Sequence, residues 1–227
     1  MIQFLGEVRK LKLDKKCMKL YLVTDRTWLS ENDLMLQVEE AIQAGVTFVQ
    51  LREKDISASR FIDEAKYLRK ITKQYDIPFV INDNLNVAIA ADADGVHVGQ
   101  TDTDAKVVRE IIGPSKILGV SVQTVEQALL AQENGADYIG VGALFSTSTK
   151  LDAKNVTIKT LSDICRSVTI PVVAIGGINK ENINQLKGSG VDGVAVISAI
   201  LAQSHITEAT KTLSRLSDEL VCVRKDS

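Results

Sequence analysis

The residues that follow an apolar segment at 48–51 alternate in a way that could bind an anion. In the stretch QLREK (50–54), Gln50, Arg52 and Lys54 occupy every second position, so an extended chain directs them to one side. Two cations on one side suit an anion such as a diphosphate, because an ionised partner strengthens each hydrogen bond. The alternative is an ordinary solvated loop of charged residues.

Two carboxylates follow the next two apolar segments. Asp83 comes directly after Asn82 at the end of one segment, and Asp102 lies a few residues beyond the other. Mg²⁺ is commonly held by one or two carboxylates, several waters and the phosphate oxygens of a substrate. Either residue could instead cap the N-terminus of a helix. Because both accompany the cations at 52 and 54, the pattern favours a metal–diphosphate site.

Hydroxyl groups and glycines form a second candidate for anion binding. Residues 146–149 are all Ser or Thr and are followed by Lys150, although a hydroxyl-rich surface loop would have the same composition. Farther along, Gly176 and Gly177 follow an apolar segment, and glycines let backbone N–H groups approach an anion closely. A short helix that begins at Ser198, after Ile197, would direct its positive end toward the same ligand. We therefore expect a monophosphate site near these residues.

Histidine and cysteine are too few and too scattered for several other chemistries. His97 lies within an apolar segment, where a structural role is the more common one, and His205 is far along the chain. This argues against a Ser-His-Asp hydrolase and against a multi-histidine zinc site. Cys17, Cys165 and Cys222 are widely spaced and odd in number, so we expect reduced thiols and no disulfide framework.

The elements that must position these residues alternate regularly along the chain. Helix-like stretches with apolar residues at three- and four-residue spacing, such as 33–44, 59–75, 125–134 and 180–187, separate short apolar runs. Strands that are apolar on both faces are typical of parallel sheets covered by helices. Eight such runs can be counted, at residues 20–24, 48–51, 79–81, 95–98, 117–120, 138–141, 172–175 and 193–196.

Eight strands favour a closed (β/α)8 barrel, the TIM-barrel fold, over an open doubly wound sheet. No linker-like break interrupts the pattern, so we predict one domain over residues 1–227. Residues 1–17 precede the first strand and form an N-terminal extension, predicted as an extra helix that covers the bottom of the barrel. In such barrels the catalytic residues gather at the carboxyl ends of the strands. The candidate polar residues described in the preceding paragraphs lie at or beyond the ends of predicted strands.

The composition of the 227 residues is that of an ordinary globular protein. Hydrophobic residues make up 45% and charged residues 25%, with a formal net charge of −2. This balance argues against a nucleic-acid or membrane-surface binder, which would carry an excess of basic residues. The first sixteen residues are interrupted by charges and lack the apolar core of a signal peptide. We expect a cytoplasmic protein with small-molecule substrates, and a homo-oligomer is compatible with this composition.

Eight short motifs, in register, resemble the thiamine phosphate synthase (thiamine phosphate pyrophosphorylase) family and span residues 20–200. They are LYLVTD (20–25), QLREK (50–54), IND (81–83), DGVHVGQ (94–100), GVSV (119–122), TSTK (147–150), AIGGI (174–178) and VISAI (196–200). The resemblance implies a (β/α)8 barrel that condenses 4-amino-5-hydroxymethyl-2-methylpyrimidine diphosphate with 4-methyl-5-(2-phosphoethyl)thiazole. The products would be thiamine phosphate and diphosphate, formed by Mg²⁺-assisted dissociative substitution.

The resemblance also implies a role for each matched residue. Asp83 and Asp102 would bind Mg²⁺ against the diphosphate, and Gln50 would orient the pyrimidine. The diphosphate oxygens would be contacted by Arg52, Lys54, Asn82, Ser121 and Lys150, and of these Arg52, Lys54, Ser121 and Lys150 would be catalytic. The thiazole phosphate would be held by Thr147, Ser148, Thr149, Gly177, Ile197 and Ser198.

The sequence departs from the family pattern at two places. Ala143 and Ser146 replace two prolines that usually precede the Thr/Lys loop, which predicts a looser loop on the thiazole side. Gln123 replaces a histidine that often follows strand five and on which related thiazole tautomerases depend more strongly. The alternatives are such a tautomerase, or a non-catalytic phosphometabolite-binding protein on the same barrel.

Overall fold

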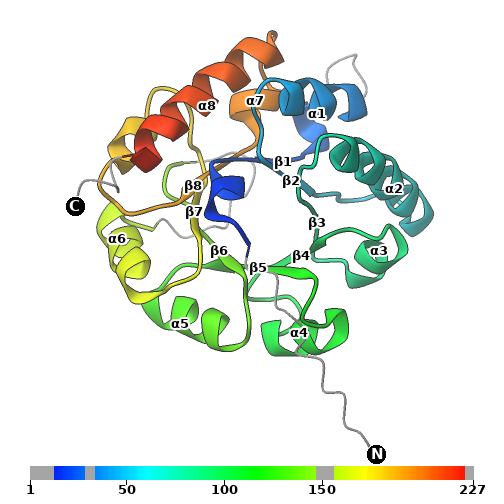
Figure 1. Ribbon diagram of the computed structural model, residues 1–227, viewed down its shortest axis with the longest axis horizontal. Helices are drawn as coiled ribbons and strands as arrows, with labels where there is room; N and C mark the ends of the chain where they lie inside the picture. The colour runs from blue at the N-terminus through cyan, green and yellow to red at the C-terminus, as the bar shows by residue number, and fades with distance from the viewer. Residues whose placement is uncertain (1–12, 29–33, 147–155, 223–227) are drawn as a thin grey trace, which may run out of the picture.

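Eight parallel strands close into a barrel in chain order, β1 to β8 (Figure 1). The computed structural model describes residues 13–28, 34–146 and 156–222. This confirms the predicted (β/α)8 barrel. The strands are β1 (Leu20–Val23), β2 (Phe48–Leu51), β3 (Phe79–Asn82), β4 (Gly95–Val98), β5 (Ile117–Val122), β6 (Tyr138–Val141), β7 (Val172–Ile175) and β8 (Gly193–Val196).

Helices form a ring around the strands (Figure 1). The α-helices are α1 (Leu34–Gln43), α2 (Ala58–Gln74), α3 (Leu85–Ala90), α4 (Ala105–Ile112), α5 (Val125–Glu133), α6 (Ile158–Ser167), α7 (Ser198–Leu201) and α8 (Ile206–Cys222). Three short 3₁₀ helices, η1 (Lys15–Met18), η2 (Arg26–Trp28) and η3 (Ile183–Leu186), complete the described elements. Among the described residues, no helix is long and apolar enough to cross a membrane.

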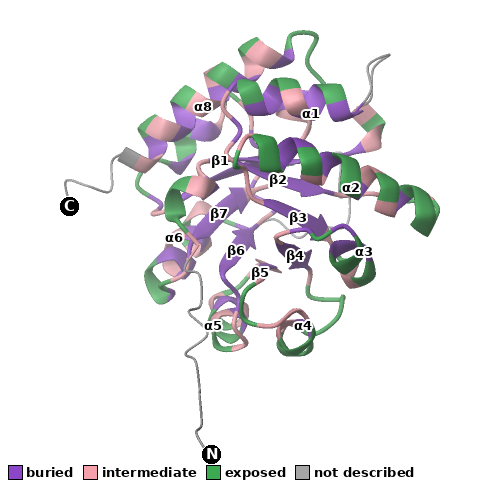
Figure 2. Ribbon diagram, turned by 45° about the vertical axis from the view of Figure 1, so that its right-hand side comes forward, coloured by how far each residue is buried: buried purple, intermediate pink, exposed green. Residues whose placement is uncertain are grey.

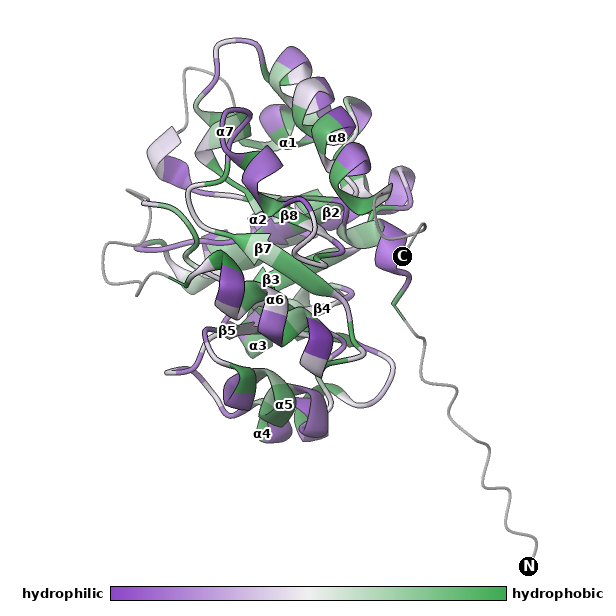
Figure 3. Ribbon diagram, turned by 90° about the vertical axis from the view of Figure 1, so that its left-hand side faces the viewer, coloured by the Kyte–Doolittle hydropathy of each residue, from purple (hydrophilic) through white to green (hydrophobic). Residues whose placement is uncertain are grey.

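The strands are buried on both faces, as their unbroken apolar sequences predict. Figure 2 shows the strands almost entirely buried, while α2 turns an exposed face to solvent. Figure 3 shows the same division by hydropathy, since α8 alternates hydrophobic and hydrophilic residues and β7 is mostly hydrophobic. The helices therefore cover the outer face of the barrel with their apolar stripes and hold it closed.

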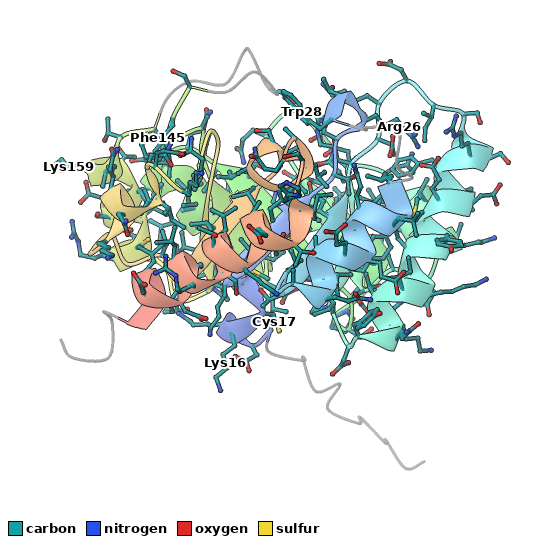
Figure 4. All side chains as sticks on the ribbon, turned by 90° about the horizontal axis from the view of Figure 1, so that it is seen from above. Lys16, Cys17, Arg26, Trp28, Phe145 and Lys159 are labelled. Atoms are coloured by element: carbon teal, nitrogen blue, oxygen red, sulfur yellow. The ribbon has the colours of Figure 1, made fainter. Side chains whose placement is uncertain are left out.

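Aromatic side chains fill the interior of the barrel. The rings of Tyr21, Phe48 and Tyr138 pack with centroids 4.5–5.9 Å apart, in tilted and edge-on arrangements. Met18 of η1 joins the same cluster from the bottom of the barrel, and Cys17 packs against it. Figure 4 shows Cys17 at the end of the barrel opposite Arg26, which lies beyond β1. Among the described residues, the interior is therefore a packed core of aromatic and apolar side chains.

A repeated pair of hydrogen bonds joins neighbouring strands near the bottom of the barrel. Asp94, which precedes β4, donates its backbone N–H to the carbonyl of Phe79 and accepts the Phe79 N–H on its carboxylate, at 2.8 and 2.9 Å. Asp137 does the same for Leu118 on β5, Asp192 for Val172 on β7, and Thr47 for Leu20 on β1. Every odd-numbered strand thus has an N–H at its start, the first or in β5 the second, bound by the residue that leads into the next strand.

Cations compensate the three carboxylates in this repeat. Arg69 pairs with Asp94, Arg109 with Asp137 and Lys15 with Asp192. Arg109 also donates to the backbone carbonyls of Gly135, Gly113 and Lys116, so it fastens several turns at once. A buried carboxylate is tolerated where hydrogen bonds and an opposite charge both satisfy it.

Two predicted elements differ from the structure. The helix predicted at 180–187 is wrong, because only the 3₁₀ turn η3 forms there. Its two buried apolar residues, Ile183 and Leu186, are three apart, which suits one 3₁₀ turn but cannot give a longer helix a buried stripe. Of the predicted N-terminal helix, residues 1–12 lie outside the described residues, and the rest contributes to η1.

Replacing Asp137 with Ala should destabilise the protein by about 2–4 kcal/mol, because it leaves the Leu118 N–H and the Arg109 charge unpaired. Thermal unfolding should then occur roughly 5–15 °C lower. The control is Asp163→Ala on the surface of α6, where the carboxylate pairs with Lys159 and Arg166 and its loss should lower the unfolding temperature far less. Equal effects of the two variants would contradict a special role for the strand-capping carboxylates.

Candidate active site

The carboxyl ends of the strands surround a cavity of about 340 Å³ at the open end of the barrel. The aromatic residue Tyr21 forms part of its lining, and Gly140, Gly142 and Gly176 contribute backbone to its wall. A concave site with a few converging polar groups is typical of small-molecule binding. Its main polar side chains are Gln50, Arg52, Asn82, His97, Ser121 and Gln123, from β2 to β5 and the residues that follow β2 and β5.

Arg52 is held at this cavity by a carboxylate that sequence reasoning did not assign. The Arg52 guanidinium donates to Asp25 Oδ2 at 2.7 Å, and Asp25 directly follows Thr24 at the end of β1. Burial alone would raise the pKa of Asp25, but hydrogen bonds from Thr27 and the charge of Arg52 outweigh it and hold that pKa below its usual range. The pair therefore stays ionised, and Arg52 remains a cation at the mouth of the barrel.

A second ion pair lies directly behind the first. Arg26 Nε donates to Glu53 Oε2 at 2.5 Å, and its other nitrogen pairs with Glu64 on α2. Asp25 thus pairs with Arg52, and the next residue, Arg26, pairs with Glu53. These two ion pairs fix the ends of β1 and β2 against each other and hold Arg52 at the cavity.

Lys54 lies outside the cavity. Strand β2 ends at Leu51, and of the residues beyond it Arg52 lines the cavity whereas Lys54 does not. Lys54 is exposed and is not among the residues that line the cavity. The predicted contact of Lys54 with a diphosphate stays a prediction.

Asp83 and Asp102 come together at one edge of the site. Their carboxyl groups are within hydrogen-bonding reach, and burial, followed by the hydrogen bond and charge of Asp102, raises the pKa of Asp83 to about 6. Asn82 donates to Asp83 at 2.6 Å and the Gly99 N–H donates to Asp102 at 2.7 Å. The structure thus joins the two carboxylates that the sequence placed after neighbouring strands.

The alternative reading of these two residues as helix caps is wrong. Helix α3 is capped by Asn84, whose side chain accepts from Val87 N–H, and α4 is capped by Asp104, which accepts from Lys106 N–H. Asp83 also adopts a left-handed backbone conformation, with φ of 60°, which is uncommon for a residue with a side chain. Such conformations concentrate at functional sites.

The pair of carboxylates fits a divalent cation that keeps part of its water shell. Like charges this close disfavour ionisation of both, and a hard cation between them would remove that cost. Within residues 13–28, 34–146 and 156–222 no cluster of three or more His, Cys, Asp or Glu could hold a metal by itself. Two carboxylates supplemented by water and substrate oxygens are, however, an ordinary Mg²⁺ site.

A chain of hydrogen bonds crosses the floor of the cavity. Gln50 Nε2 lies 2.6 Å from the Tyr21 hydroxyl, which lies 2.7 Å from the Tyr138 hydroxyl. Tyr138 in turn contacts His97 Nδ1 at 2.9 Å, and His97 Nε2 lies 2.8 Å from Ser121 Oγ. His97 is thus hydrogen-bonded at both ring nitrogens, and both ends of the chain, Gln50 and Ser121, line the cavity.

Glycines on the neighbouring strands make room for this chain. Gly119 lies opposite His97 in the register of β4 and β5, and a Cβ there would come within 2.2 Å of Tyr138 and 2.4 Å of His97. Gly140 lies opposite Ser121 on β6, and a Cβ there would come within 3.4 Å of the His97 ring. The two glycines, on β5 and β6, therefore leave space for the histidine.

The ends of β7 and β8 form the opposite side of the site. Gly176 and Gly177 have φ of 100° and 66°, and a Cβ on either would collide with the backbone at Ala143 or Ser146. The two glycines are therefore required by close packing of the β6 loop as well as by backbone conformation. Asn182 donates to the Gly177 carbonyl at 2.8 Å and fixes the turn.

The predicted phosphate-binding residues divide between two hollows. Ile197 lines the barrel cavity, whereas Gly177 and Ser198 line a groove of about 570 Å³ beside it, where α7 begins. Thr147, Ser148, Thr149 and Lys150 lie outside the described residues. The stem of that loop is attached to β7, since Leu144 and Phe145 donate to the carbonyls of Ile175 and Gly176.

Comparison with known proteins gives consistent relatives. A family model described as thiamine monophosphate synthase matches residues 20–200. A thiamine-phosphate synthase of Clostridium botulinum is 52% identical over 201 residues, covering 88% of this chain and 94% of the relative. One of Ruminiclostridium cellulolyticum is 56% identical over 194 residues, covering 86% and 92%. The structure of thiamine phosphate pyrophosphorylase from Pyrococcus furiosus superimposes with a TM-score of 0.84 at 40% identity, covering 91% of this chain and 98% of that one.

Replacing Asp83 with Asn should stabilise the metal-free protein at pH 8 and leave it unchanged near pH 4. The folded protein keeps a proton on Asp83 up to about pH 6, whereas an unfolded Asp loses it near pH 4, so stability falls as pH rises through that window. Asparagine removes this cost and tolerates the left-handed backbone. Thermal unfolding should shift upward by roughly 1–3 °C at pH 8.

The same variant should lose the stabilisation that Mg²⁺ gives the parent protein above pH 6. Asp104→Asn is the matched control, because asparagine caps α4 as well as aspartate does. If Mg²⁺ stabilises Asp83→Asn as strongly as it stabilises the parent, the carboxylate pair is not the metal site.

Proposed function

The chain belongs to the thiamine monophosphate synthase family, and we propose that it joins 4-amino-5-hydroxymethyl-2-methylpyrimidine diphosphate to 4-methyl-5-(2-phosphoethyl)thiazole. The reaction releases diphosphate and thiamine phosphate, so the protein is a transferase. The observation that best supports this function is the convergence of Arg52, Asn82 and Ser121 on one cavity beside the Asp83–Asp102 pair. This combination suits a metal-bound diphosphate.

The main demand of this reaction is stabilisation of the leaving group. The aminopyrimidine can carry positive charge on its methylene carbon, so the diphosphate departs before or while the thiazole nitrogen attacks. Negative charge then accumulates on the diphosphate oxygens, where the Arg52 cation and the donors of Asn82 and Ser121 would stabilise it. Mg²⁺ held by Asp83 and Asp102 would neutralise part of the same charge when bound.

The reaction needs little acid–base chemistry from the protein, and the site matches that requirement. The thiazole nitrogen attacks as a neutral nucleophile, and no proton has to leave it. Gln50 is buried beneath the cavity, where its amide would orient the pyrimidine ring. Holding both substrates in one orientation supplies much of the remaining rate enhancement.

The thiazole phosphate would bind at the ends of β7 and β8. Gly177 and Ile197 would offer backbone donors there, and Ser198 would offer its backbone and hydroxyl. Thr147, Ser148, Thr149 and Lys150 complete this proposal from the sequence, with Lys150 extending to the diphosphate. Lys54 is exposed, and its side chain would have to turn toward the cavity to contact the diphosphate.

The purified protein should form thiamine phosphate and diphosphate in equal amounts when both substrates and Mg²⁺ are supplied. Asp83→Asn should lower the rate at least tenfold, because the charge of the leaving group is less well neutralised. The control Asp104→Asn should retain the parent rate. Both products are measured in the same sample, by chromatography and by a coupled diphosphate assay.

Two other outcomes would overturn the proposal. Isomerisation of the thiazole without release of diphosphate would identify a tautomerase. Binding of the thiazole phosphate with neither product would identify a non-catalytic binding protein. The cytoplasmic location and a homo-oligomeric state stay predictions from composition, as does one domain over residues 1–227.

A further inference from the structure

The hydrogen-bond chain under the cavity has a direction, and that direction reaches the substrate. We infer that Tyr138 and His97 are positioning residues that make Ser121 a hydrogen-bond donor toward the cavity. The consequence for catalysis rests on the proposed function, whereas the direction of the chain can be measured without it.

The direction begins at Gln50, the one member of the chain whose contacting atom can only donate. Its Nε2 lies 2.6 Å from the Tyr21 oxygen, so Tyr21 accepts there. A tyrosine hydroxyl has one proton, and Tyr21 must then direct it to its other partner, the Tyr138 oxygen at 2.7 Å. Tyr138 accepts this hydrogen bond, so its own hydroxyl proton remains available for donation.

The direction continues through the histidine ring. The Tyr138 hydroxyl donates a hydrogen bond to His97 Nδ1, 2.9 Å away. A neutral imidazole that accepts at Nδ1 carries its proton on Nε2. His97 Nε2–H therefore donates to Ser121 Oγ at 2.8 Å. Because that lone pair of Ser121 is occupied by the histidine proton, the hydroxyl proton of Ser121 points elsewhere, and the cavity is what it faces.

Burial keeps both tyrosine hydroxyls protonated and shields the chain from water. Tyr21, Gln50, His97 and Tyr138 are exposed by 2, 4, 8 and 0%. Burial raises the pKa of both tyrosines well above the ordinary value, so each hydroxyl keeps its proton. Gly119 leaves the space that the His97 and Tyr138 rings occupy, since a Cβ there would collide with both. Hydrogen bonds in so dry an interior polarise one another and are stronger than in water.

The chain would matter most when charge develops in the cavity. A free serine hydroxyl can rotate and either donate or accept. Here one lone pair of Ser121 accepts from His97, so the serine proton is not directed at the histidine and would be donated to an anionic oxygen in the cavity. A hydrogen bond to an ionised acceptor is about twice as strong as a neutral one, and a donor already aligned loses little freedom when the substrate binds.

The direction can be read from the His97 ring by ¹⁵N NMR of the substrate-free protein. We expect a proton on Nε2 and none on Nδ1. His205 is the other histidine, so a His205→Asn sample assigns the signals. A proton on Nδ1 would overturn the inference, because the chain would then run from Ser121 to Gln50. This measurement does not depend on which reaction the protein catalyses.

The catalytic consequence can be tested by a double-mutant cycle. Tyr138→Phe should lower kcat by about 5- to 30-fold with a smaller change in KM, because Ser121 loses its alignment. In a Ser121→Ala background the same change should have almost no further effect, since nothing is left to align. Tyr67→Phe, at an exposed position on α2, is the matched control and should leave the rate unchanged.

Each other result has a distinct meaning. If Tyr138→Phe is equally harmful with and without Ser121, its role is structural and the inference fails. Tyr21→Phe, one step farther from Ser121, replaces Tyr138→Phe if that variant does not fold, and the same coupling is expected. If the parent forms no thiamine phosphate at all, the proposed function fails, while the NMR result still decides the direction of the chain.

Discussion

Two tyrosine hydroxyls that meet inside the barrel constrain much of what surrounds them. Tyr21 and Tyr138 fill the interior with their rings, but an unpaired hydroxyl in that position would cost on the order of 1–3 kcal/mol. Gln50 of β2 and His97 of β4 provide the remaining partners. Gly119 must lack a side chain for the rings to fit. The same group of residues forms the floor of the cavity, so the packing of the core also sets how deep a substrate can enter.

Charge is arranged around this floor in separate sectors. Cationic and anionic residues after β1 and β2 pair with each other and leave Arg52 at the cavity, with Asp25 as its fixed counter-ion. The carboxylates Asp83 and Asp102 stand next to this sector and carry a repulsion that only a proton or a cation relieves. The side formed by β7 and β8 relies on backbone groups and glycines. A diphosphate and a monophosphate would thus be recognised by different kinds of donor, which keeps each substrate in its own half of the site.

Local sequence patterns predicted the parts of this structure that depend on local physics. Each strand is a short run of apolar residues, and the polar residues that follow mark the open end of the barrel, so the approach of Asp83 to Asp102 follows from parallel topology. Contacts between distant segments were not accessible in the same way. The partner of Arg52 depends on how the end of β1 turns, and the position of Lys54 depends on where β2 stops. His97 has the sequence setting of any buried histidine, and only the three-dimensional neighbours Tyr138 and Ser121 distinguish it.

The strand-capping residues near the bottom of the barrel divide the fold into four units. Each of these residues hydrogen-bonds to a residue at the start of the preceding strand. In the pairs of Thr47, Asp94, Asp137 and Asp192 the two residues are 27, 15, 19 and 20 positions apart in the sequence. Contacts of this sequence separation close small loops, which costs less chain entropy than pairing distant segments. Each pair of strands, β1–β2 through β7–β8, can therefore satisfy its own backbone at the bottom before the barrel is complete. The ring can then be described as four strand–helix–strand units. The pairings between units are β2–β3, β4–β5, β6–β7 and β8–β1, and these close the barrel.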